Sequence, residues 1–404
     1  MSTSGSALAP FRQHGYPALA ASNAISRSAV GVSLVALVWL VKADPGAIGL
    51  LFALRAGAGL VFGIPAGLLA DRMDRRTLLI LANLAAIAIA LAAATAAAVG
   101  MLPQWAILLV ALSFGVVDSF QMVSAQAYTY DLVGPLLATS GIAIAAIGVQ
   151  LGIALGNLVA GTVVDDYGAA AAFLVVAAAS GLSAVLLLLG APSARVRRAR
   201  APAAIDLPPM TVRASLVLVR RNHVLGLLAV AVIVTEIFGF SAWVLQPVFA
   251  DQVFDTDAAG YGLMGAVMRL GGAAALVVVA IYGARLTRGS VLLTASGVFG
   301  ASLMVLAVSP TLAIALIPIF VVGGMAAVSD SLSQSLMQRS TLDSERGAAM
   351  GVWTFGVGCG PVGSVAVGLA AARVGAPVTQ LVAGAILLVL TVGLSFNRAL
   401  RTLR

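Results

Sequence analysis

The sequence predicts an all-α membrane protein with twelve transmembrane helices in two related six-helix halves. Of its 404 residues, 61% are apolar and only 9% are charged, whereas soluble domains carry about 25% charged residues. Apolar runs long enough to span a bilayer, about 20 residues each, recur along the whole chain. A soluble core of this size would need a charged surface that this composition cannot supply.

Short polar or glycine-containing segments separate the twelve predicted spans. A longer basic segment, 191–222, follows the sixth span; it holds four prolines and seven arginines and is expected to end in a short amphipathic helix. The expected domains are therefore a bundle over 1–190, a cytoplasmic linker over 191–222 and a bundle over 223–404. The spans are 16–41, 46–70, 77–99, 103–130, 138–164, 168–190, 223–250, 258–284, 289–308, 311–338, 347–372 and 376–397.

The basic residues predict the orientation of the chain. If both termini face the cytoplasm, the cytoplasmic segments hold 18 of the 23 Lys and Arg residues, and the outer segments hold only Lys42 and Arg373. Basic residues accumulate on the cytoplasmic side of membrane proteins. We therefore expect a multi-pass protein of the cell (inner) membrane with both termini cytoplasmic. The mixed, polar first fifteen residues do not resemble a cleavable signal peptide.

The composition argues against several other classes of function. The net charge of +8 lies mostly in short segments between spans, where it sets topology, so no nucleic acid is expected as a partner. The single cysteine, Cys359, excludes a disulfide framework and a cysteine-based metal site. We find no metal-ligand cluster, no nucleophile–base pair and no phosphate-binding loop. An enzyme, a metal or a cofactor is therefore not expected.

Six ionisable residues are predicted to lie deep inside the spans. A charged side chain at the bilayer centre costs about 2.5–3.5 kcal/mol, so such residues face the interior of the protein. Three are basic and three acidic, and the third, sixth, ninth and twelfth spans contain none. They are Arg27, Arg55, Asp118, Glu236, Arg269 and Asp330.

Two sequence matches at similar offsets indicate an internal repeat. "ALRAGAG" (53–59) matches "VMRLGGA" (267–273), and "VDSF" (117–120) matches "SDSL" (329–332). Arg55 thus corresponds to Arg269, and Asp118 to Asp330. Two interpretations stay open: each arginine and aspartate forms a buried ion pair that braces its half, or a carboxylate binds a proton when its arginine moves away.

Glu236 is the odd member of this set. The repeat places Asn23 at its counterpart, and no arginine lies within two turns of it in sequence. It is therefore at least as good a candidate for a proton carrier as Asp118 or Asp330. Phe240 and Trp243 follow at i+4 and i+7, which suits a cationic or amphipathic solute, unless both simply face lipid or core. Further cavity candidates are Asn23, Gln121 and Tyr128, and, more weakly, Gln150 and Gln334.

The loop "GLLADRMDRR" (67–76) resembles the signature that the major facilitator superfamily carries between its second and third helices. An aspartate, Asp74, stands where that signature has its second glycine. The resemblance implies a cytoplasmic latch in which a glycine allows close helix approach, an aspartate caps a helix, and an arginine binds Asp131. The alternative is that the arginines only anchor the topology. The implied gate residues are Gly67, Asp71, Arg72, Arg75, Arg76 and Asp131.

Two weaker resemblances point to a branch of that superfamily. "GVQLGIALGN" (148–157) is similar to the glycine-rich motif of its proton antiporters, although small residues at this spacing also serve close helix packing. "GCGPVGS" (358–364) is an analogous stretch in the eleventh span, where Pro361 is expected to kink the helix. The run 118–133 resembles the enterobactin-exporter and macrolide-efflux branch.

These resemblances imply a secondary transporter that works by alternating access. The leading expectation is proton-coupled export (efflux by proton antiport) of a small organic compound such as a drug, siderophore or secondary metabolite. The alternative is an importer or facilitator of a small nutrient. The expected partners are the small-molecule substrate, protons and the lipid bilayer, and the superfamily implies a monomer.

Overall fold

The computed structural model describes residues 8–192, 212–342 and 345–403, and these are almost entirely helical. The linker predicted over 191–222 falls largely on 193–211, outside the described residues. Its predicted amphipathic end is α5, Val212–Arg221, with Arg220 and Arg221 in its last turn. A short helix over Ala9–Arg12 precedes the first long helix.

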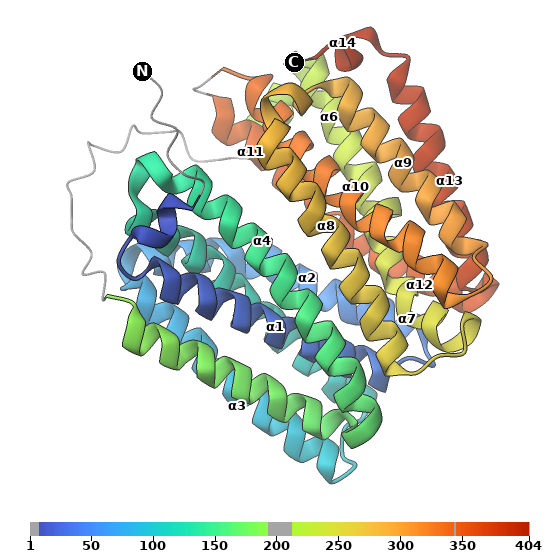
Figure 1. Cartoon of the computed structure of the whole chain (residues 1–404). Helices are drawn as coiled ribbons and strands as arrows, with labels where there is room; N and C mark the ends of the chain where they lie inside the picture. Colours follow the sequence, from blue (N-terminus) through green and yellow to red (C-terminus); the bar gives the residue numbers. More distant parts are fainter. Residues whose placement is uncertain (1–7, 193–211, 343–344, 404) are drawn as a thin grey trace. The chain divides into compact units, whose positions relative to one another are not determined.

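The first six predicted spans appear as four helices (Figure 1). The 87 residues labelled α4 are three helices in series, separated by two residues with a non-helical backbone. The bends lie at Gly134 (φ 71°) and Gly168 (φ 80°), backbone angles that favour glycine because it has no Cβ. The predicted spans 103–130, 138–164 and 168–190 are its three parts. The bounds are α1 Tyr16–Leu40, α2 Pro45–Arg72, α3 Arg75–Ala98 and α4 Gln104–Gly190.

The seventh predicted span is irregular. It starts as α6, His223–Val234, and continues through a π-helical turn, Thr235–Gly239, a 3-10 segment, Phe240–Leu245, the short α7, Gln246–Val248, and a second π-helical turn, Phe249–Val253. π-Helical turns are rare and occur frequently at functional sites. Glu236 lies in the first of them.

The remaining spans match their predicted ranges within a few residues. The eleventh divides into α11 and α12 at residues 358–359, and Pro361 begins the second piece, as expected from its missing N–H. The bounds are α8 Ala258–Leu286, α9 Gly289–Ala307, α10 Leu312–Arg339, α11 Arg346–Val357, α12 Gly360–Val374, α13 Ala376–Ser395 and the short α14 Arg398–Arg401.

Ten helical segments of the described residues are long and apolar enough to cross a membrane, and α4 alone holds three of the predicted spans. The count therefore agrees with the twelve spans expected from the sequence. Many large apolar side chains are exposed on these helices, for example Ile64 and Leu155. Such exposure on a long apolar helix is what contact with lipid requires.

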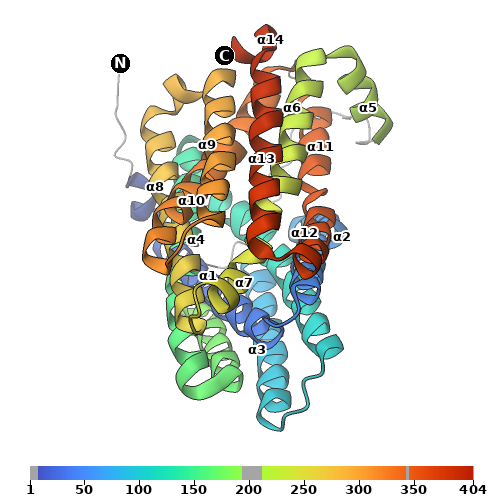
Figure 2. The same cartoon turned by 90° about the vertical axis from the view of Figure 1, so that its right-hand side faces the viewer.

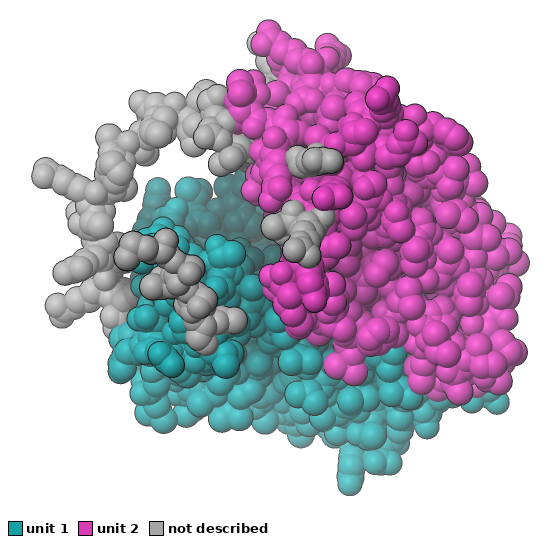
Figure 3. Space-filling view, turned by 45° about the horizontal axis from the view of Figure 1, so that its top comes forward, with its two compact units in different colours: residues 1–42, 54–199, 255–269 teal, residues 43–53, 200–254, 270–404 magenta. Residues whose placement is uncertain are grey.

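The chain divides into two compact units (Figure 3). Unit 1 comprises residues 1–42, 54–199 and 255–269; unit 2 comprises 43–53, 200–254 and 270–404. Both α2 and α8 are divided between the units, whereas the sequence predicted whole helices on either side of a linker. Parts of these two helices thus pack with elements that are distant in sequence.

Glycine allows close helix contact in unit 1. A Cβ added at Gly152 or Gly156 would overlap the carbonyl oxygens of Ala24 and Ser28, so the second part of α4 lies directly on the backbone of α1. A Cβ at Gly148 would meet no heavy atom within 4 Å. Two of the three glycines in the 148–157 motif thus serve close packing.

In unit 2 the apolar core lies among α6, α9, α10 and α11. Leu225, Leu228, Leu336 and Met337 are almost completely buried there. Helices α9 and α13 run side by side, as both cartoon views show (Figures 1 and 2). Gly300 and Gly384 face one another in this contact, each too close to the other's carbonyl oxygen for a side chain.

Candidate functional site

Arg55 of α2 and Asp118 of α4 form a buried ion pair in unit 1. The Nε and Nη2 atoms of Arg55 donate to Asp118 Oδ2 at 3.1 and 2.9 Å. The two helices can approach this closely because Gly115, one turn before Asp118, contacts the Arg55 backbone; an added Cβ would lie 2.9 Å from Arg55 Cα. In unit 1, Arg55 and Asp118 therefore form the buried ion pair that the sequence predicted as one of two interpretations.

A second acceptor and a second arginine complete the cluster. Ser33 Oγ of α1 accepts hydrogen bonds from Arg55 Nη1 and Nη2 at 3.1 and 3.2 Å. Arg27 Nη1 lies 4.0 Å from Asp118 Oδ1, and Arg27 Nη2 donates to Gln121 Oε1 at 3.4 Å. With two guanidinium groups and one carboxylate, the cluster carries a formal charge of +1.

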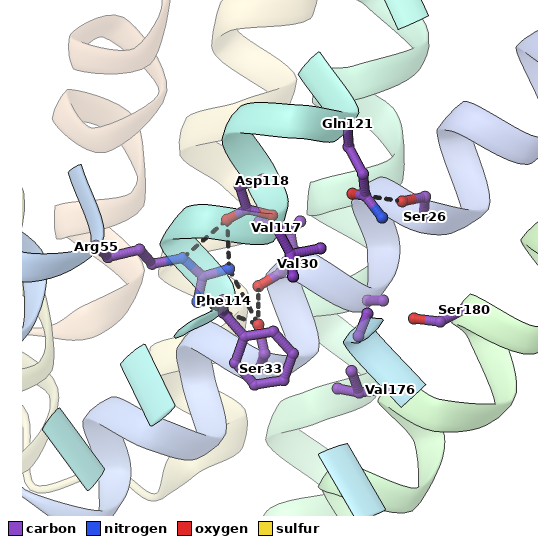
Figure 4. Close-up of a pocket in the computed structure, with 12 residues that line it drawn as sticks. Ser26, Val30, Ser33, Arg55, Phe114, Val117, Asp118, Gln121, Val176 and Ser180 are labelled. Carbon is purple, nitrogen blue, oxygen red and sulfur yellow. Dashed lines mark hydrogen bonds and ion pairs between the residues drawn. The ribbon is translucent and has the colours of Figure 1, made fainter. Parts of the chain in front are cut away.

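Hydrogen bonds extend from the cluster into the bundle. Ser26 Oγ donates to Gln121 Oε1 at 2.9 Å, and Gln121 Nε2 donates to Asn83 Oδ1 at 3.3 Å. Figure 4 shows Arg55 reaching Asp118 and Ser33, while Gln121 points toward Ser26. Gln121 and Ser26 border two narrow, water-sized hollows, and Asn23 lines the second. Both hollows are lined mainly by hydroxyl, amide and small apolar groups.

Arg269 is placed with unit 1. Its Nη1 atom donates to Gln150 Oε1 at 3.3 Å, within that unit. Asp330, its predicted partner, belongs to unit 2. The pairing of Arg269 with Asp330 therefore stays a prediction, because the first twelve residues of α8 belong to one compact unit and α10 to the other.

Glu236 and Asp330 both belong to unit 2. Glu236 is half-buried in the π-helical turn, and a Cβ added at Gly360, beside the break in the eleventh span, would lie 3.1 Å from its Oε2 atom. Asp330 is exposed on α10. Within the described residues neither carboxylate has an ion pair, in contrast to Asp118.

The aromatic residues beside Glu236 pack against each other. The rings of Phe240 and Trp243 meet edge to face at 4.9 Å, and Phe240 meets the fully buried Phe299 at 5.8 Å. Phe240 is thus partly a core residue, as the alternative interpretation held. The spacing i+4 and i+7 from Glu236 does not define one α-helical face here, because Glu236 lies in the π-helical turn and both aromatic residues lie in the 3-10 segment that follows it.

Tyr128 is placed differently from its prediction as a cavity residue. It is completely buried, and its hydroxyl donates to the carbonyl of Pro192. It packs with Leu19, Leu79 and Leu187 in a core cluster of unit 1. Gln334 is half-buried on α10. Gln121 thus lies beside the Asp118 cluster, and Asn23 lines a hollow that Gln121 also borders. Tyr128 lines neither of the two hollows described above.

The loop motif between α2 and α3 makes a compact set of contacts. Arg75 Nη1 donates to Asp131 Oδ1 at 2.5 Å and to the Ala127 carbonyl at 3.0 Å, so it joins the start of α3 to the first part of α4. Arg76 donates to the carbonyls of Leu187 and Leu188 at 3.0 and 2.7 Å. These are charge-assisted hydrogen bonds, which are stronger than those between neutral groups.

Two details of the motif differ from the prediction. A Cβ added at Gly67 would meet no heavy atom within 4 Å, so Gly67 makes no close helix approach in this structure. Asp71 caps no helix; its carboxylate lies 3.6 Å from Arg75 and is largely exposed. The helix cap is Asp74, which accepts from the Thr77 N–H and hydroxyl, so the residue that departs from the family signature starts α3. Arg72 is exposed.

We expect Asp131→Asn to loosen the start of α3 by about 1–2 kcal/mol, because it removes the charge from a charge-assisted hydrogen bond. Hydrogen–deuterium exchange should then rise in peptides covering 70–80. Asp71→Asn is the matched control, and little change is expected from it, since an exposed ion pair at 3.6 Å contributes little. Equal effects of the two variants would contradict a special role for the Arg75–Asp131 contact.

Sequence reasoning missed the polar partners of the charged residues. Ser33 accepts from Arg55, and Ser26 and Asn83 bond Gln121. Ser26 and Ser33 are seven residues apart on α1, a spacing that places them on one helix face. That spacing was readable from the sequence, but serine is common in such helices and the contact needs the neighbouring helix.

The fold is that of a multi-pass helical membrane protein of the major facilitator type. Among solved structures the chain is similar to a D-xylose–proton symporter (TM-score 0.72, 13% identity, covering 94% of this chain and 96% of that one). It is also similar to a bacterial homolog of the human lysosomal transporter Spinster (0.70, 15%, 96% and 96%) and to the nucleoside transporter NupG (0.68, 13%, 94% and 98%). These likenesses establish the fold.

The sequence then assigns the family. Residues 5–404 match the model of the transmembrane secretion effector family, and the chain belongs to that family. No curated protein matches the sequence. The chain is therefore a secondary transporter that crosses the membrane many times.

Proposed function

We propose that the protein is a proton-coupled exporter of a small organic compound, with Glu236 and Asp330 as the proton-binding carboxylates. One observation carries this assignment: both acids lie in unit 2 without an arginine partner among the described residues, whereas Asp118 is bonded to Arg55. A carboxylate already neutralised by a guanidinium has little tendency to take up a proton. Asp118 then acts mainly as part of a structural brace.

The surroundings of Glu236 support a role in which its local structure changes during transport. It lies in a π-helical turn next to the break between α11 and α12, where the regular hydrogen-bond ladder is interrupted on both elements. π-Helical turns inside helices occur frequently at functional sites. The Ser241 hydroxyl, which donates to the carbonyls of Glu236 and Gly360 at 2.9 and 3.2 Å, links the two interruptions.

The direction of transport and the cellular location follow from weaker arguments. The family description speaks of secretion, and the glycines of the 148–157 motif resemble those of antiporters, so export is the preferred direction. The distribution of basic residues favours the inner membrane with both termini in the cytoplasm. The solute is proposed to be cationic or amphipathic, because two carboxylates and the ring of Trp243 suit a positive group. A monomer is the expected working unit.

The alternative function is an importer or facilitator of a nutrient. A protein named as a D-xylose–proton symporter shares the fold, so the fold alone does not select antiport over symport. The hydroxyl and amide groups around Gln121 would suit a polar, uncharged solute. This observation is the one that favours the alternative.

The two functions are separated by measuring solute and proton movement together. Purified protein is first screened by thermal shift against a solute library, and a stabilising solute is then tested in proteoliposomes that contain a pH-sensitive dye. Export by antiport predicts that solute moving one way drives protons the other way, and that an imposed pH gradient concentrates the solute. Co-directional movement would support the symport alternative, and solute flux without proton movement would contradict both coupled mechanisms.

A further inference from the structure

The second part of α4 ends against the first turn of α8, in unit 1. Asp165 Oδ1 accepts the N–H of Ala258 at 3.0 Å, and Asp165 Oδ2 accepts the N–H of Ala259 at 2.7 Å. The first N–H groups of a helix have no partner within the helix, and a negative charge is stabilised there. A single carboxylate thus joins two segments that are more than 90 residues apart in the chain.

Asp165 is not simply the cap that α8 would otherwise lack. The helix has its own capping residue, Asp257, whose Oδ1 accepts the N–H of Gly260 at 3.0 Å. The side chain of Asp257 comes from the same turn and can hold α8 together by itself. The contribution of Asp165 is therefore a link between helices.

Below this link the two helices touch backbone to backbone. A Cβ added at Gly161 would lie 2.5 Å from Ala259 Cα, and one added at Gly265 would lie 2.5 Å from Asn157 Nδ2. Asn157, Gly161 and Asp165 are spaced by four residues and so share one helix face. The crossing is close along its whole length, and the carboxylate lies at its end.

Asn157 lies inside the crossing and is almost completely buried. Its Nδ2 atom lies against Gly265 of α8, whereas its Oδ1 atom faces Gly31 of α1. The crossing is therefore packed tightly around this amide.

The corresponding crossing in unit 2 has the glycines but lacks the carboxylate. Gly49 and Gly368 bring α2 and α12 into backbone contact. However, α2 begins with Pro45, which has no N–H, and its next N–H groups donate to Asp44 of the same turn. Aligned on Gly168 and Gly375, which both have a positive φ, Asp165 corresponds to Ala372. At the α4–α8 crossing, by contrast, a carboxylate of one helix accepts N–H groups of the other.

We propose that Asp165 is a releasable clamp between α4 and α8, which keeps closed the end of the transporter where these helices meet. The charge distribution predicts that this end faces outward. The inference rests on the proposed alternating-access function: the crossing must part for that end to open, and the two N–H bonds of Asp165 must break at the same step. Asp165 is a positioning residue that touches no solute.

The test measures how often the crossing opens, without reference to transport. Ala258 is completely buried, and Cys359 is the only native cysteine. In a Cys359→Ser chain that also carries Ala258→Cys, the rate of maleimide labelling reports separation of α8 from α4. Asp165→Ala is expected to raise this rate about five- to tenfold, the factor that corresponds to losing a typical helix-terminal hydrogen-bonding side chain.

Two controls isolate the clamp. Asp166→Ala removes the neighbouring exposed carboxylate and should leave labelling unchanged. Asp257→Ala removes the cap within α8, and should speed amide exchange in that first turn without the same rise in labelling. If Asp165→Ala has no effect, or if either control matches it, the proposal is overturned. Asp165→Asn, which keeps one acceptor oxygen, should give an intermediate rate if the alanine variant folds poorly. If Asp165→Ala raises the labelling rate but the protein transports no solute, the clamp is supported and the proposed transport function is refuted.

Discussion

Asp118→Ala is expected to destabilise the protein by about 3 kcal/mol. The substitution leaves Arg55, whose side chain is 10% exposed, and Arg27, at 9%, as buried guanidinium groups without a carboxylate. Removing one partner of a buried ion pair typically costs 3–5 kcal/mol, because an uncompensated charge stays buried. We place the effect at the lower end of this range because 22% of the Asp118 side-chain surface is exposed. The unfolding temperature of the purified protein in detergent measures it.

A double variant distinguishes the buried charge from a packing defect. Asp118→Ala combined with Arg55→Met removes both partners and leaves an apolar side chain in place of the arginine. Replacing a buried ion pair by apolar groups of similar volume is often nearly neutral. The double variant should therefore recover much of the lost stability. An Asp118→Ala protein as stable as the parent, or a double variant no better than the single one, would contradict the role of Asp118 as a brace.

Glu236→Gln is expected to abolish solute accumulation driven by a pH gradient, while solute exchange continues. Glutamine has nearly the same shape as glutamate but cannot release a proton, so the variant mimics one protonation state permanently. Because Glu236 takes part in no ion pair among the described residues, the substitution should leave stability within about 0.5 kcal/mol of the parent. The measurement is uptake into inside-out vesicles with and without an imposed gradient, together with counterflow at equal pH.

Asp330→Asn and Asp118→Asn complete this series. If the two unit 2 acids share the coupling, Asp330→Asn should also reduce accumulation, and Asp118→Asn should mainly lower stability. Full gradient-driven accumulation by Glu236→Gln would remove Glu236 from the mechanism. The same result for Glu236→Gln and Asp118→Asn together would contradict proton coupling through either residue.

The helical spans and the interior charges were readable from the sequence because they depend on composition along a single helix. Apolar runs of about 20 residues must be helical in lipid, where every backbone group needs an internal partner. The same argument predicts that Arg27, Arg55 and Asp118 avoid lipid. The bend at Gly168 and the break before Pro361 also follow from local backbone chemistry.

The pairing of those charges could not be read in the same way. Internal repetition correctly predicted that Arg55 meets Asp118, whereas the residues of the second predicted pair, Arg269 and Asp330, belong to different compact units. The two halves of a repeat share a pattern of residues, whereas a contact requires two helices to approach at a given depth. Gly115 permits that approach for α2 and α4, while the start of α8 packs elsewhere, with Gln150 beside Arg269.

The sequence by itself thus determined a multi-pass helical membrane protein and the position of its charged residues along the helices, because each depends on residue type and spacing along one helix. Only the tertiary structure decided which charges are neutralised, that Asp74 rather than Asp71 caps α3, and that Asp165 closes on α8. The physical reason is distance: hydrogen bonds and ion pairs act over about 3–4 Å. Whether two side chains come that close is decided by the packing of helices that are far apart in the chain.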